Sequence, residues 1–138
     1  MPQFLPVNVT GIDGLTTASA ANPFPVAAVP ATSTAIAPVV STALEASHVL
    51  KASAGTFYGG DAYAASVPGY VMLFDSATVP ADGAVTPLKS WPIAASAGIA
   101  VGYNPPIACA NGIVVVFSTT GPFTKTVSAT AFFSMTVA

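Results

Sequence analysis

The last residues of the chain, TVSATAFFSMTVA (126–138), alternate in polarity from one position to the next. The odd-numbered positions are all apolar, and the even-numbered positions up to Thr136 carry hydroxyl groups, with Phe132 as the exception. A period of two is typical of a β-strand that has one face against a core. We therefore expect a strand here, with Phe132 on its outer face. The residues expected to face the core are Ala129, Ala131, Phe133 and Met135.

The outer row of this strand carries no charge, although exposed strands of natural proteins usually carry lysine, proline or another feature that prevents pairing with other chains. We expect the strand to be covered, either by the N-terminal segment of the same chain or by a neighbouring subunit.

The rest of residues 44–138 has the same character, with short apolar stretches separated by turn-forming residues. No helical periodicity persists for more than two turns, and turn signals recur every 8–12 residues, which is typical of an antiparallel sandwich. We expect an all-β fold, an antiparallel β-sandwich of jelly-roll or immunoglobulin-like topology, with a bulge at Gly59-Gly60. The stretches expected to form strands are LEASHVLKA, TFYGGDAYAA, GYVMLFD, VTPLKSWPIA, AGIAVGY, GIVVVFS and the C-terminal segment.

Residues 1–43 differ in composition from the rest of the chain. They are rich in Ala, Pro, Thr, Val and Ser, contain six prolines, and have Asp13 as their only charge. Proline prevents a long helix and favours extended chain. We expect an extended arm that contributes docking rather than folding energy and lies across its own domain or a neighbouring subunit, with a flexible linker as the alternative.

Charged residues make up only 6% of the chain, and none of them is arginine. Three scattered lysines cannot neutralise a run of phosphates, so we expect no binding to nucleic acid. The same scarcity of cations argues against docking on an anionic membrane, and proline interrupts the apolar N-terminal run before it reaches a spanning length. That run also lacks the basic region of a signal peptide. An uncharged surface of this kind is instead expected to be buried against other subunits.

Few residues could support chemistry, and each has a structural interpretation. His48 is the only histidine, and we expect it to be a hydrogen-bonded core residue, although a Ser-His-Asp hydrolase stays open. Cys109 is expected to be a small buried hydrophobe. Asp61, Asp75 and Asp82 are expected to stabilise turns, with a Ca²⁺ site as the alternative. We therefore predict no catalytic residue, no cofactor and no metal.

Aromatic residues are the better candidates for binding, because tyrosine and tryptophan bury a large area and keep a polar tip. Core packing accounts for most of them, with one or two left at a surface for a protein partner or a sugar ring. The candidate interface residues are Phe132, Tyr58, Tyr63, Trp91 and Tyr103.

Two segments carry a resemblance to a known family: GYVMLFDSATVPADGAVTPLKSWPIAA and PPIACANGIVVVFSTTGPFTKTVSATAFFS. A hydrophobic strand that ends in FD, a loop containing PADG, and a closing block FSTTGPFTKTxSATA resemble small structural proteins of tailed bacteriophages and prophages of α-proteobacterial type. The resemblance covers about residues 48–138 and leaves out the proline-rich arm. It implies a virion component with a β-sandwich fold, and it implies no catalytic residue.

The sequence thus favours a structural virion protein, specifically a decoration or cement protein of the capsid. Its expected partners are the major capsid protein or other virion proteins, and it is expected to form a homo-oligomer, with a trimer favoured. The alternative is a receptor- or glycan-binding module of a head or tail fibre that uses tyrosine and tryptophan faces. A hydrolytic enzyme is the third and least supported interpretation.

Overall fold

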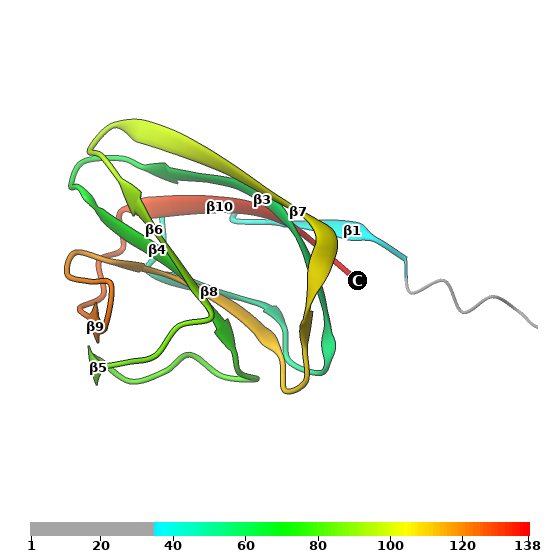
Figure 1. Ribbon diagram of the computed structural model, residues 1–138. Helices are drawn as coiled ribbons and strands as arrows, with labels where there is room; N and C mark the ends of the chain where they lie inside the picture. The colour runs from blue at the N-terminus through cyan, green and yellow to red at the C-terminus, as the bar shows by residue number, and fades with distance from the viewer. Residues whose placement is uncertain (1–34) are drawn as a thin grey trace, which may run out of the picture. The chain divides into compact units, whose positions relative to one another are not determined.

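The computed structural model describes residues 35–138, which form an all-β domain built from antiparallel sheets, as predicted (Figure 1). Within these residues no helix is long and apolar enough to cross a membrane. The strands are β1 (Ala37–Val40), β2 (Ser47–Lys51), β3 (Gly55–Ala64), β4 (Gly69–Asp75), β5 (Gly83–Ala84), β6 (Lys89–Ile93), β7 (Ala97–Cys109), β8 (Ile113–Ser118), β9 (Thr124–Lys125) and β10 (Ala131–Val137).

Eight of these strands form two four-stranded sheets. One sheet has the order β1-β10-β3-β7, the other has the order β2-β8-β4-β6, and the short strands β5 and β9 pair separately. In an immunoglobulin-like sandwich the first two strands are neighbours in one sheet. Here β1 and β2 lie in different sheets, and the last strand lies between the first and the third. Of the two topologies expected from the sequence, the strand order is that of a jelly roll.

The main core lies between the two sheets and is centred on Phe57, Phe117 and Phe133, which are completely buried. The alternation at the C-terminus is confirmed within β10, where Ala131, Phe133, Met135 and Val137 face this core. It fails before the strand begins, because Ala129 is exposed. Residues 126–130 belong instead to a loop. The backbone N–H groups of Thr126 and Val127 donate to the Ser118 hydroxyl and the Asp82 carboxylate, not to a neighbouring strand.

The two central strands of the second sheet, β4 and β8, are buried on both of their faces. On the face away from the main core, Met72, Phe74, Val114 and Val116 form a second buried cluster. Two segments cover this cluster: residues 76–88, which include β5 and place Val85 against it, and residues 119–127, which include β9 and place Gly121 beside Met72. We call them the loop layer. Burial on both faces explains why GYVMLFD and GIVVVF read as continuous apolar runs instead of alternating.

Strand β10 has a neighbour on each side, β3 on one and β1 on the other. Pro38 of β1 lies opposite Thr136. Proline has no N–H group to donate, and it is tolerated here because β1 is an edge strand. The sheet therefore begins before residue 43, the predicted end of the arm. β1 pairs with the edge of β10 and not with its outer row, so the cover expected for that row stays a prediction. Residues 1–34, the greater part of the predicted arm, lie outside the described residues.

The bulge predicted at Gly59-Gly60 is confirmed. The pairing of β3 shifts register beside Gly59 toward both neighbouring strands. Gly59 has φ +133° and Gly60 has φ +145°, and a Cβ atom at Gly59 would lie 2.2 Å from the carbonyl oxygen of Val101. Only glycine accepts both the backbone conformation and this close approach.

The position of β1 predicts different outcomes for two truncations. Deleting residues 1–34 should leave the melting temperature of the domain nearly unchanged. Deleting residues 1–43 removes β1 and the core contact of Val39, and it should destabilise the domain by about 2 kcal/mol or more, roughly 10 °C in Tm. Thermal unfolding of both variants by circular dichroism tests this, and equal Tm values would show that β1 is dispensable.

Phe133 tests the core assignment. Its side chain is completely buried between the sheets, so Phe133→Ala should destabilise the domain by about 3–5 kcal/mol in denaturant unfolding. Ala129→Ser is the matched control, because Ala129 belongs to the same predicted face but is exposed. A small loss for Phe133→Ala would contradict the packing described for β10.

Candidate functional site

The outer face of the sheet β1-β10-β3-β7 is the candidate site. Asp61 is the only charged residue in its four strands, whereas the other sheet carries Lys51, Asp75 and Lys89. Apart from Asp61, its outward positions carry hydroxyl, aromatic or small apolar side chains: Pro38, Val40, Tyr63, Gly98, Ala100, Gly102, Phe132, Ser134 and Thr136.

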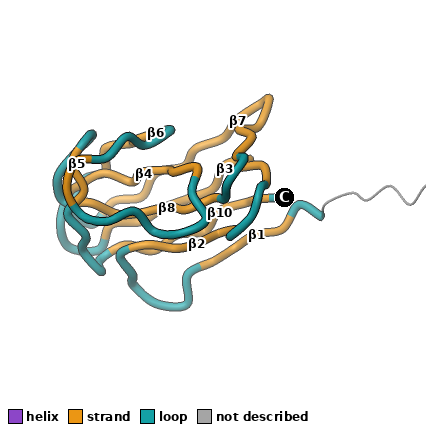
Figure 2. The backbone as a smooth tube through the Cα atoms, turned by 90° about the horizontal axis from the view of Figure 1, so that it is seen from below, coloured by secondary structure: helices purple, strands orange, loops and turns teal. Residues whose placement is uncertain are grey.

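Two of the five predicted interface residues meet on this face. Phe132 of β10 is directly opposite Tyr63 of β3 in the register of the sheet. Tyr63 is 42% exposed, and Phe132 is half-buried. An exposed tyrosine beside a phenylalanine offers apolar area with a polar tip, which suits a protein partner. Figure 2 shows β1 and β7 at opposite margins of this sheet, with β10 and β3 between them.

The other three candidates are placed differently. Tyr58 lies at the bulge of β3, half-buried and opposite no residue of either neighbouring strand. Trp91 and Tyr103 pack against the main core, with ring centroids 6.4 Å apart and each also beside Phe57. They close the gap between the two sheets where β6 and β7 form the margins. Lys89 lies 5.7 Å from the centroid of the Tyr103 ring and covers it from outside.

His48 belongs to a polar cluster at the start of β2. Its Nδ1 lies 2.6 Å from Oε1 of Glu45, and the same carboxylate oxygen accepts a hydrogen bond from the hydroxyl of Ser41. The Ser41 hydroxyl in turn accepts the backbone N–H of Phe133 at 2.9 Å. His48 is hydrogen-bonded, as predicted, but it is half-buried and belongs to neither core cluster, so its predicted place in the core is wrong.

This cluster does not have the geometry of a catalytic triad. In a triad the imidazole accepts the proton of the serine. Here the carboxylate accepts it, and Ser41 is buried, with only 5% of its surface exposed. Ser41 also donates its own backbone N–H to the carbonyl oxygen of Phe133 at 2.8 Å. These bonds attach the segment between β1 and β2 to β10, which is a structural role.

The two aspartates that flank the loop 75–82 have separate partners. Asp75 accepts the backbone N–H groups of Ala110, Asn111 and Gly112 at 3.1, 2.7 and 3.3 Å, so it holds the turn between β7 and β8. These bonds, led by the one from Asn111, keep the pKa of Asp75 below its ordinary value. Asp75 thus stabilises a turn, but not the local turn predicted, because its partners lie more than thirty residues along the chain.

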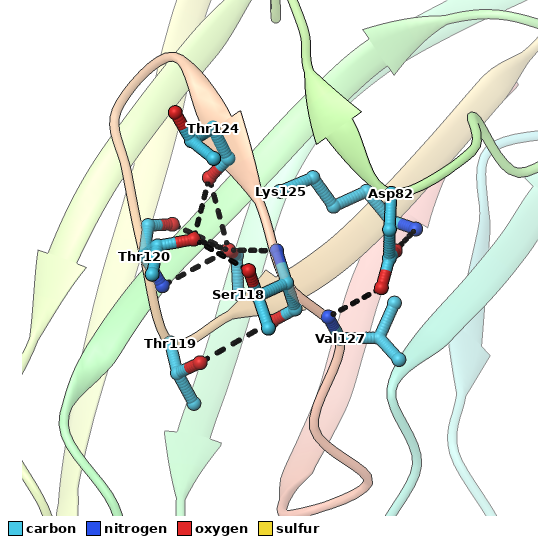
Figure 3. Close-up of polar contacts among 8 residues, drawn as sticks. Asp82, Ser118, Thr119, Thr120, Thr124, Lys125 and Val127 are labelled. Carbon is cyan, nitrogen blue, oxygen red and sulfur yellow. Dashed lines mark hydrogen bonds and ion pairs between the residues drawn. The ribbon is translucent and has the colours of Figure 1, made fainter.

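Asp82 pairs with Lys125, whose Nζ lies 2.5 Å from Oδ1, and it accepts the backbone N–H of Val127 at 3.3 Å. The hydrogen bond from Lys125 is the main cause of the lowered pKa of Asp82. Lys125 is only 3% exposed, so its aliphatic chain is part of the loop layer and its ammonium group reaches out to Asp82 (Figure 3). Residues 35–138 contain no group of three metal-ligating side chains of the His, Cys, Asp or Glu type.

A network of hydroxyl groups stabilises the second loop of the layer, and Figure 3 shows Ser118 at its centre. The Ser118 hydroxyl accepts the N–H of Thr126 at 2.9 Å, and its single proton is shared between the carbonyl oxygens of Thr120 and Thr124. The Thr120 hydroxyl also donates to the carbonyl oxygen of Thr124 at 3.1 Å. The serines and threonines of this segment therefore replace a regular strand with bonds to their own backbone.

Cys109 is buried, as predicted, at the end of β7. Burial raises the pKa of its thiol, and the negative charge of Asp75 raises it further. Because the thiolate is the reactive form, both effects make this cysteine unreactive.

A shallow groove at one end of the domain was not predicted from the sequence. It is lined by Tyr70, Ile93, Thr119 and neighbouring small residues. A Cβ atom at Gly121 would lie 2.8 Å from the Tyr70 ring, so the backbone of the loop layer already covers part of one face of that ring.

Comparisons with known protein families, with curated proteins and with solved structures find no match to this chain.

The ion pair of the loop layer predicts a dependence of stability on pH. Because the folded-state pKa of Asp82 is lower than the ordinary value of 3.8, its contribution is fully present above that value and is lost as pH falls through the folded-state pKa. Asp82→Asn should lower Tm at neutral pH, where Lys125 loses its partner. It should also reduce the loss of Tm between about pH 5 and about pH 2.

The matched control is Asp61→Asn, which removes a carboxylate from the exposed outer face and should change Tm at neutral pH very little. An Asp82→Asn variant with the same Tm as the wild type at neutral pH would show that the ion pair does not hold the loop layer.

Proposed function

We propose that this protein is a structural component of a tailed-phage virion, a capsid decoration protein that docks on other virion subunits. The observation that carries the proposal is the outer face of the sheet β1-β10-β3-β7, which presents Tyr63 and Phe132 among small and hydroxyl residues with Asp61 as its one charge. Depletion of charge together with enrichment in aromatic residues is typical of the centre of a protein interface.

The fold supports this proposal by analogy, because jelly rolls recur in viral capsid proteins. A fold alone does not determine function, so the analogy is secondary to the composition of the outer face, which indicates a protein interface.

The resemblance to phage structural proteins supports the proposal from another side. Its two loop segments, PADG and GPFTKT, meet in the structure, where Asp82 of the first pairs with Lys125 of the second. Residues that hold a covering loop in place suit a protein with a mechanical role. In this proposal the major capsid protein or another virion protein is the partner.

Docking in a particle accounts for the scarcity of charge. A free monomer with an uncharged face has little protection against non-specific association. A shell that contains many copies supplies the partner at a high local concentration, so a face of modest apolar area is sufficient for attachment.

A second candidate is a receptor- or glycan-binding module of a head or tail fibre. Jelly rolls also occur in lectins, and the groove beside Tyr70 and Thr119 combines an aromatic ring with a hydroxyl group. Gly121 covers part of that ring, which leaves less of it for stacking on a sugar. Specific binding to a glycan array that is abolished by Tyr70→Ala in a folded variant would favour this candidate.

The docking proposal predicts a loss of attachment without a loss of fold. Phe132→Ser and Tyr63→Ser should each weaken binding to capsids that lack the protein by about tenfold or more, the effect of removing a central interface residue. The Tm of the isolated domain should change by only a few degrees, because neither side chain belongs to the main core. Co-sedimentation with capsids, measured beside thermal unfolding, gives both values.

Val49→Ser is the matched control, because Val49 is 39% exposed on β2 of the other sheet. Unchanged binding for Phe132→Ser and Tyr63→Ser, or equal weakening by Val49→Ser, would contradict docking through the outer face.

A further inference from the structure

The four margins of the sandwich are protected to different degrees against pairing with other chains. β1 contains Pro38, β2 contains His48 and Lys51, and β6 contains Lys89 and Pro92. Charged residues and proline are the usual means of preventing edge-to-edge association. Residues 97–103 of β7, AGIAVGY, contain neither.

Hydrogen bonds show which backbone groups of β7 are free. The N–H of Ala65 donates to the carbonyl oxygen of Thr130 at 2.8 Å, in the segment where β3 pairs with β10. Backbone groups of successive residues point to opposite sides of a strand. Ala64, Ala62 and Gly60 therefore direct their backbone groups toward β7.

The partners of these residues on β7 are Ala97, Ile99 and Val101. Gly98, Ala100 and Gly102 consequently direct their N–H and C=O groups away from the sheet, and all three residues are exposed. In the described part of the chain β7 pairs with β3 alone. A Cβ atom placed on Gly102 would meet no atom within 4 Å.

We propose that residues 97–103 of β7 form a homotypic pairing edge that joins two copies of this chain. In an antiparallel pair centred on Ala100, Gly98 lies opposite Gly102 of the other copy, and Ala100 lies opposite its own equivalent. These pairs exchange backbone hydrogen bonds on both sides of a two-fold axis. The turn at Ser96, which has φ 55°, and the prolines at 105 and 106 limit the paired segment at its two ends.

A second copy fits this edge better than an arbitrary strand does, because each row of side chains is complementary to itself. The outer row contains only glycine and alanine, so no side chain obstructs the approach. In the inner row Ile99 lies opposite Val101 of the other copy, and both are half-buried apolar residues whose pairing across strands is favourable.

The charges also permit this pairing. Asp61 lies opposite Ala100 on β3, one strand away from the edge. Two Asp61 carboxylates would therefore be about 14 Å apart, three strand spacings. This distance exceeds the Debye length of about 8 Å at physiological salt, so repulsion between them is weak.

The test uses the full chain and compares variants of Ala100 by sedimentation velocity over a range of concentrations. Wild type should form a dimer, and Ala100→Ser should do the same. Ala100→Pro removes the central N–H from the free edge without breaking a bond to β3, and it should weaken dimerisation by about tenfold or more. Monomers at all concentrations, a trimer, or a dimer unaffected by Ala100→Pro would overturn the proposal.

A charge exchange tests the register and does not depend on the proline variant being folded. Ala100→Lys and Ala100→Glu each place two like charges opposite one another across the two-fold axis and should weaken the homodimer by about fivefold. A mixture of the two variants should restore the dimer as a heterodimer. Equal dimerisation of the mixture and of each variant alone would show that residue 100 does not lie at the axis.

Discussion

The insertion of β10 between β1 and β3 is the interaction on which the rest of the domain depends. It places Phe133 and Met135 at the centre of the main core, and it joins the beginning of the described chain to its end within one sheet. Such a sheet is complete only when strands nearly a hundred residues apart have paired, which makes folding slow compared with local structures. Ser41 and Glu45 extend this pairing along β10 beyond the end of β1.

Local patterns were sufficient to predict the elements that depend on local chemistry. The alternation around Phe133 predicted a strand with one buried face, and the double glycine at 59–60 predicted a bulge. The pairing of β1 could not be predicted, because an edge strand with Pro38 reads as extended arm until its partner is known. The pairing of Asp82 with Lys125 could not be predicted either, because it joins segments far apart in sequence. The alternating pattern also wrongly predicted a buried Ala129, because the Ser118 hydroxyl holds the backbone of residue 126 in a loop.

The domain separates its charges from one of its faces. Apart from Asp61, the lysines and aspartates of residues 35–138 lie on the second sheet and its loops, where Asp75 and Asp82 bond to backbone and ammonium groups. The first sheet presents Tyr63 and Phe132 on its outer face and an unprotected margin at β7. In the proposed virion these two surfaces have different roles, because the face docks on other subunits and the margin joins copies of the chain.

The copy number of this protein in purified virions tests the central proposal most directly. Quantitative mass spectrometry of particles, calibrated against the major capsid protein, measures it without any variant. A decoration protein should be present in hundreds of copies per particle. A handful of copies would indicate a fibre or tail component, and absence from purified particles would contradict the account.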